Sequence, residues 1–149
     1  MTLGWHTVME FSPSLVGCMI TAQNHSFELI AKSKECVINI PEVSLADIIV
    51  GIGNTSGFDT DKFAKFGLTA EPAKKVKAPL IKECYANLEC KVIDTSMVKK
   101  YNFFILEVVA ARAPHNPKYP QTIHYRGDGI FMVSGKTLNL KSKFKSPNL

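Results

Sequence analysis

Short strands joined by turns fill most of the second half of the sequence. Residues 86–92 alternate between apolar and polar side chains, the pattern of a strand with one face in solvent. A longer apolar strand follows at 102–111, and strands at 122–125 and 130–134 flank a tight turn at 126–129. Turns and loops, not long helices, connect these strands, so we expect antiparallel hairpins. The pattern favours a mainly β barrel with short inserted helices over a parallel doubly wound sheet.

Three more strands are expected in the first half. Residues 2–10 and 15–22 would pair across the turn at 12–14, and the strong apolar character of 15–22 indicates a buried strand. A further strand at 36–40 ends at Pro41, which has no backbone N–H to continue a ladder.

Helix signals lie between these strands. Ser26 can cap a short helix. Ser44 and Asp47 have the spacing of a capping box, before a helix that Gly53 ends. A third helical turn covers 62–66. At 149 residues the chain is expected to form one domain over 1–149, with a basic C-terminal tail at 137–149.

Charge and cysteine usage limit the function classes. The net charge is +5, but the lysines gather around one turn and along the tail, without interleaved aromatic residues, so nucleic-acid binding is not expected. The four cysteines form no Cys-x-x-Cys pair and no metal-like spacing with the histidines. Cys18, Cys36 and Cys90 fit small buried side chains. With no signal-peptide pattern and no apolar run near the ~20 residues of a membrane span, a reduced cytoplasmic protein is expected.

One group of residues indicates an anion site. Asn24, His25 and Ser26 add side-chain donors at the expected start of a helix, where unpaired N–H groups and the helix dipole favour phosphate. Gly4 would let a planar ligand approach the backbone, with Thr2 and Trp5 beside it. Each residue also has a plainer interpretation: Ser26 as an ordinary cap, and Trp5 as a core residue.

The glycines at 51–57 look like a dinucleotide-binding fingerprint, but their spacing is wrong. They also follow a predicted helix, whereas the fingerprint follows a strand and opens a helix. A dinucleotide fold is therefore not expected.

Taken in order, most of the chain resembles the flavin reductase-like family, in particular its flavoredoxin-like branch. The resembling segments are 1–8, 12–20, 24–30, 35–41, 51–54, 61–63, 67–69, 101–104 and 127–129. The resemblance implies an FMN-binding split barrel that works as a homodimer, with the flavin near the subunit interface. It leaves two functions open. One is an NAD(P)H-dependent flavin oxidoreductase, and the other is an FMN-binding electron carrier that serves a protein redox partner.

The same resemblance assigns candidate cofactor residues. Thr2, Leu3, Gly4 and Trp5 would line the isoalloxazine ring and ribityl chain, and Asn24, His25 and Ser26 would hold the phosphate. A second side of the site would contain Gly53, Asn54 and Lys62.

The resemblance also bears on His124 and on the strand expected before residue 1. His124 either faces the nicotinamide or is an ordinary strand histidine. Family members have a further strand before the Met-Thr motif. The resemblance therefore predicts a shortened barrel, which lacks part of the flavin-binding wall unless upstream residues restore it.

Overall fold

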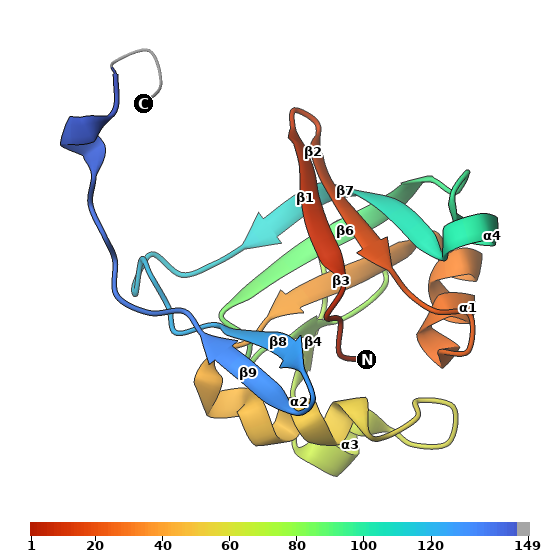
Figure 1. Cartoon of the computed structure of the whole chain (residues 1–149). Coiled ribbons are helices and arrows are strands. Elements are labelled where there is room, and N and C mark those ends of the chain that lie inside the picture. Colours follow the sequence, from red (N-terminus) through yellow and green to blue (C-terminus); the bar gives the residue numbers. More distant parts are fainter. Residues whose placement is uncertain (146–149) are drawn as a thin grey trace.

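The structure is a computed structural model that describes residues 1–145, and its centre is one antiparallel sheet. Within those residues five strands pair in the order β1-β2-β7-β6-β3 (Figure 1). Their bounds are β1 (His6–Phe11), β2 (Ser14–Met19), β7 (Phe103–Arg112), β6 (Ala86–Asp94) and β3 (Glu35–Ile40).

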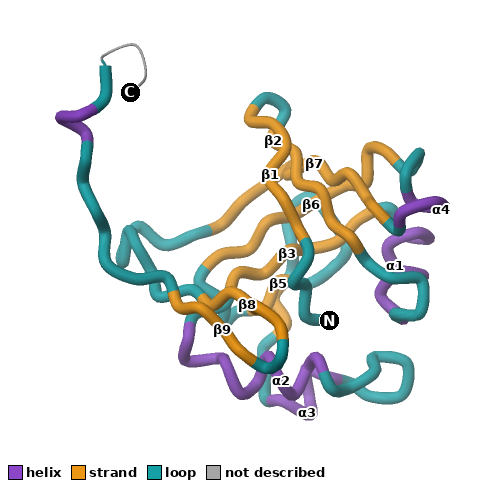
Figure 2. The backbone as a smooth tube through the Cα atoms, in the orientation of Figure 1, coloured by secondary structure: helices purple, strands orange, loops and turns teal. Residues whose placement is uncertain are grey.

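Smaller elements surround this sheet (Figure 2). Two short sheets pair β4 (Ala70–Glu71) with β5 (Leu80–Ile81) and β8 (Ile123–Gly127) with β9 (Ile130–Val133). The helices are α1 (His25–Ser33), α2 (Ala46–Gly53), α3 (Lys62–Phe66) and α4 (Val98–Tyr101), with 3-10 turns η1 (Val43–Leu45) and η2 (Lys141–Lys143). Within residues 1–145 no helix is long and apolar enough to cross a membrane.

The mainly β prediction is confirmed, but the first two strands are shorter than expected. β1 begins at His6 and not at residue 2, and β2 ends at Met19. One backbone hydrogen bond of 3.0 Å, from the Met19 N–H to the Trp5 carbonyl, continues the β1–β2 pairing beyond its last strand pair, His6 with Cys18. Residues 1–4 then leave the sheet, which frees them to line a site.

The core lies on one face of β2, β7 and β6. Its most buried side chains are Cys18, Ile20, Ile30, Cys90, Phe104 and Leu106. Cys18 stands opposite Phe104 in the β2–β7 ladder, and both are fully buried. The prediction that Cys18 and Cys90 are small core residues is confirmed, and half-buried Cys36 pairs with Cys90 across β3 and β6.

Ser26 and Ser44, the two predicted helix N-caps, are not N-caps in the structure. The first helix starts at His25, so Asn24 is the N-cap and Ser26 lies inside the first turn. Leu45 is the N-cap of α2, because Ser44 lies within the 3-10 turn η1 that precedes the helix. Asp61, in contrast, caps α3: its carboxylate accepts hydrogen bonds from the N–H groups of Phe63 and Ala64.

The predicted solvent face of β6 is wrong at two positions. Asn87 and Glu89 are 2% and 4% exposed, because residues 72–85 return over that face and cover it. The Glu89 carboxylate accepts hydrogen bonds from the backbone N–H groups of Lys74 (3.0 Å) and Lys75 (2.6 Å). These bonds hold the pKa of Glu89 below its usual value.

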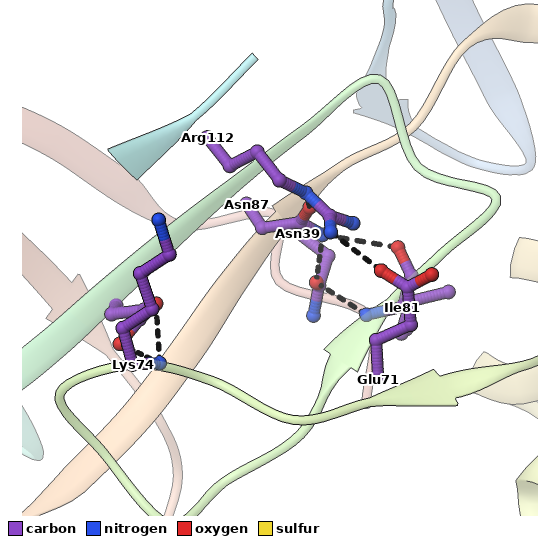
Figure 3. Close-up of polar contacts among 7 residues, drawn as sticks. Asn39, Glu71, Lys74, Ile81, Asn87 and Arg112 are labelled. Atoms are coloured by element: carbon purple, nitrogen blue, oxygen red, sulfur yellow. Dashed lines mark hydrogen bonds and ion pairs between the residues drawn. The ribbon is translucent and has the colours of Figure 1, made fainter. Parts of the chain in front are cut away.

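Asn87 is the centre of a second polar cluster (Figure 3). Its amide group donates to the Asn39 side-chain oxygen at 2.7 Å and to the Ile81 carbonyl at 3.0 Å. Its own oxygen accepts from Arg112, which also forms an ion pair with Glu71. Asn87 lies on β6 and its partners lie on β3, β5 and β7, so a buried amide is satisfied from three other strands.

The C-terminal segment extends away from the sheet after β9 (Figure 1). Of the basic tail predicted at 137–149, residues 137–145 are described and mostly exposed, and 146–149 lie outside the described residues.

We predict that Glu89→Gln changes the dependence of stability on pH. A lowered pKa means that the folded state favours the ionised carboxylate. The carboxylate therefore stabilises the fold at pH values above its unfolded pKa of ~4.3, and this stabilisation is lost as the pH falls through its pKa in the folded state. Near neutral pH the wild type should have a higher urea midpoint of unfolding than Glu89→Gln. The difference between the two midpoints should narrow towards about pH 3. Asp47→Asn, at an exposed carboxylate of α2, is the control. A difference between the midpoints that stays constant with pH would contradict the lowered pKa of Glu89.

Candidate functional site

The N-terminal segment lies between α2 and the β8–β9 hairpin. A Cβ atom placed on Gly53 would come within 3.0 Å of the Thr2 hydroxyl oxygen, so Thr2 rests directly on the end of α2. A Cβ on Gly4 would lie 3.6 Å from Cδ1 of the Tyr125 ring. Gly53 therefore allows the close approach of Thr2, whereas a Cβ on Gly4 would make ordinary van der Waals contact with Tyr125. The structure brings the predicted residues Thr2 and Gly53 together.

The start of α1 supplies unpaired backbone donors. The first N–H groups of a helix have no acceptor within the helix, and the helix dipole makes this end positive. Asn24 has extended backbone angles, and its side chain makes no capping bond within the described part of the chain. The amide of Asn24 and the first-turn N–H groups of His25 and Ser26 are thus available to an anion.

Lys62 approaches the same place from α3. A Cβ on Gly57 would lie 3.8 Å from both Cδ2 of His25 and Cε of Lys62, so this glycine separates the two side chains. The Phe58 ring meets the His25 ring edge to face at 5.8 Å between centroids. We call Asn24, His25, Ser26, Gly57 and Lys62 the α1 corner.

Lys62 is held in place and partly desolvated. Its Nζ donates to the Ile52 carbonyl, in the last turn of α2, at 2.8 Å. Burial lowers the pKa of Lys62, and the nearby Asp59 carboxylate raises it again in part. Burial and then the charge of Lys62 lower the pKa of the Met1 amino group.

Three other predicted residues, Leu3, Asn54 and Trp5, lie outside the α1 corner. The side chain of Leu3 packs against the hydrophobic core, so it would support the site from below. Asn54 ends α2, where its N–H bonds to the Val50 carbonyl. Trp5 is 69% exposed, not a core residue, and borders a shallow groove of about 310 Å³ with Met19 and Phe103.

His124 and Tyr125 are neighbours on β8, so their side chains project from opposite faces of the strand. Nε2 of His124 lies 3.0 Å from the Thr122 hydroxyl oxygen. The ring that approaches the N-terminal segment is that of Tyr125. The role of His124 stays a prediction. The sequence places Tyr125 beside His124 at the same strand end, whereas Phe58 is a site neighbour that the sequence does not single out.

The glycines at 51–57 have structural roles that differ from a dinucleotide fingerprint. Gly51 and Gly53 lie within α2, as expected from the sequence. A Cβ on Gly51 would come within 2.5 Å of the Phe66 ring, so this glycine lets α3 pack closely on α2. A larger surface cavity of about 440 Å³ lies elsewhere, beside Arg112, Tyr85 and Pro117, and contains none of the predicted site residues.

The fold is that of FMN-binding split-barrel proteins. The Desulfovibrio vulgaris (Miyazaki F) flavoredoxin superimposes with a TM-score of 0.84 at 21% identity, over 93% of this chain and 80% of that one. An FMN-binding domain of a flavin reductase-like enzyme from Shewanella baltica gives 0.80 at 23% identity, over 92% and 79%. The fold prediction is confirmed.

The family follows from the sequence itself. The pattern of the flavin reductase like domain matches residues 1–130, so the chain belongs to that family. A protein of Archaeoglobus fulgidus is 36% identical over 109 residues, which are 73% of this chain and 62% of the relative. The Escherichia coli protein YddH is 30% identical over 91% of this chain and 78% of its own length. The chain thus spans less than two thirds of the Archaeoglobus relative.

We predict that Lys62→Met weakens anion binding at the α1 corner. Loss of the hydrogen bond to the Ile52 carbonyl should cost about 1 kcal/mol of stability. Loss of the charge should lower the affinity for inorganic phosphate about tenfold, because charge-assisted bonds to phosphate are among the stronger ones. Chemical-shift titration of the His25 and Ser26 amides measures this. Lys65→Met, on the same helix, is the control, and equal phosphate affinities of the two variants would contradict the site.

Proposed function

We propose that this chain binds FMN at the α1 corner and along residues 2–5, and that it passes electrons from NADH or NADPH through the flavin to an acceptor. The observation that carries the proposal is the convergence of a helix N-terminus, His25 and Lys62 beside a backbone segment that contains Gly4. Membership of the flavin reductase-like family and the FMN-binding barrels of the same fold support it.

The residues present fit the phosphate end of FMN. A phosphate monoester needs several N–H donors and a cation, and the first turn of α1 and Lys62 offer both. Gly57 leaves room between His25 and Lys62, where a larger side chain would fill the space. Asn24 would donate from its amide group.

The ring end would lie along residues 2–5. Gly4 presents bare backbone to a planar ligand, and exposed Trp5 borders the groove next to it. Backbone N–H groups there would donate to the edge of the flavin as negative charge develops. The redox chemistry is supplied by FMN when bound, as acceptor of a hydride from the nicotinamide. The chain would bind and orient both rings, with His124 as the predicted nicotinamide-facing residue.

A flavoredoxin-like electron carrier is the second candidate. The superposition on the Desulfovibrio flavoredoxin and the exposure of Trp5, at 69%, favour it, because an exposed aromatic edge suits contact with a protein redox partner. A carrier would keep its FMN and would not oxidise NAD(P)H rapidly by itself.

We further propose that the chain works as a homodimer through β1. This edge strand is exposed along its whole length, and it presents Val8 (71% exposed) and Phe11 (87% exposed) to solvent. A long apolar edge strand is a hazard unless another chain covers it. A second copy would cover it and would lie beside the Trp5 groove.

For the reductase, NADH or NADPH oxidation with added FMN should exceed the rate without protein by at least about tenfold. Lys62→Met should weaken FMN binding about tenfold and leave riboflavin binding unchanged, because riboflavin has no phosphate. Fluorescence titrations with both flavins measure this, with Lys65→Met as control. FMN binding without NAD(P)H turnover would favour the carrier, and absence of FMN binding would exclude both.

For the dimer, Phe11→Glu should shift the protein to a monomer in sedimentation at micromolar concentration, because a buried unpaired carboxylate is strongly unfavourable. Ile93→Glu, at an exposed apolar residue of β6, is the matched control. A monomeric wild type would rule out the dimer.

A further inference from the structure

The β8–β9 hairpin is fixed at its base. The Ser134 hydroxyl donates to the Pro120 carbonyl at 2.6 Å and accepts from the Thr122 N–H at 2.8 Å. The Ser134 N–H donates to the Thr122 carbonyl, and the Val43 N–H donates to the Gln121 carbonyl, both at 2.8 Å. The hairpin is therefore attached to the start of η1, and the direction in which its side chains project is set.

In the anchored hairpin, the Tyr125 side chain contacts the N-terminal segment. Its ring lies against Gly4, packs on the Phe131 ring at 5.2 Å between centroids, and its hydroxyl oxygen accepts a hydrogen bond from the Gly129 N–H at 3.3 Å. These three contacts hold the ring in one orientation. Tyr125 is still 52% exposed, so much of the ring remains uncovered.

The α1 corner and Tyr125 lie at opposite ends of one short segment. Thr2 rests on Gly53, next to the Ile52 carbonyl that Lys62 binds, and Gly4 is beside Tyr125. The two residue steps from Thr2 to Gly4 reach at most ~7 Å in extended chain. A ligand with an anionic group at one end and a planar ring at the other can therefore contact both Lys62 and Tyr125.

We propose that Tyr125 is the aromatic wall of the flavin ring site, with the uncovered part of its ring stacked against the isoalloxazine ring beside Gly4; this rests on the proposed FMN binding. The Tyr125 ring already contacts Gly4, so the flavin would lie on the solvent-exposed side of that ring, and a pre-oriented aromatic ring binds a planar ligand at little entropic cost. The other exposed tyrosines, Tyr101 and Tyr119, instead contact the ammonium groups of adjacent lysines.

Flavin titrations of Tyr125→Ala, Tyr125→Phe and Tyr125→Leu test the proposal. Stacking on one aromatic side chain changes affinity about tenfold, so Tyr125→Ala should lose about that factor for FMN and for riboflavin alike. Tyr125→Phe should bind as wild type does. Tyr125→Leu keeps the apolar packing on Phe131 but lacks the ring, so it should resemble Tyr125→Ala. Flavin fluorescence, quenched by stacking in wild type, should rise in both non-aromatic variants.

The outcomes separate this proposal from FMN binding itself. Tyr101→Ala, at a tyrosine that is also 52% exposed, is the matched control and should bind both flavins as wild type does. If wild type binds FMN and Tyr125→Leu has unchanged affinity and quenching, the aromatic wall is wrong and FMN binding stands. A loss confined to FMN would also overturn the wall, because it would indicate a phosphate effect. If wild type binds neither flavin, both proposals fall.

Discussion

The pairing of β2 with β7 is the constraint on which both the core and the site depend. Its register sets Cys18 opposite Phe104, and both side chains are fully buried. At the end of β2 the Ile20 N–H continues this pairing to the Asn102 carbonyl, the Met19 N–H donates on the other edge to the Trp5 carbonyl, and the chain then turns into α1. A slip of one residue would move Cys18 to the solvent face and displace the start of α1. The register that fills the core therefore also positions the α1 corner beside the N-terminal segment.

Electrostatics explains why the α1 corner suits an anion. Lys62 donates to the Ile52 carbonyl at the negative end of α2, and it lies near His25 at the positive end of α1. Burial lowers the pKa of Lys62, so its charge is partly deprived of water. A bound phosphate would replace that lost solvation and raise the pKa again. Lys62 thus links the ends of two helices, and an anion relieves the cost of gathering positive charge there.

The fold could be predicted because alternation along a strand reports burial, and hairpin signals report strand pairing. The errors on β6 have a physical cause. Asn87 and Glu89 occupy the polar positions of the alternation, yet residues 72–85 cover them. The donors that satisfy Glu89 are the backbone N–H groups of Lys74 and Lys75. Every residue other than proline carries such a group, so no residue type marks a segment that will serve a buried carboxylate.

The site was less accessible to sequence reasoning, because its parts come from distant segments. Gly4 and the start of α1 carry local signals, whereas the Tyr125 contact with Gly4 joins residues at opposite ends of the chain. Alternation shows that His124 and Tyr125 face opposite ways but not which of them faces the N-terminal segment. Contacts between distant segments fix that choice. The bonds of Ser134 to Pro120 and Thr122, and the bond of the Val43 N–H to the Gln121 carbonyl, hold the base of the hairpin, and in this position the ring that contacts Gly4 is that of Tyr125.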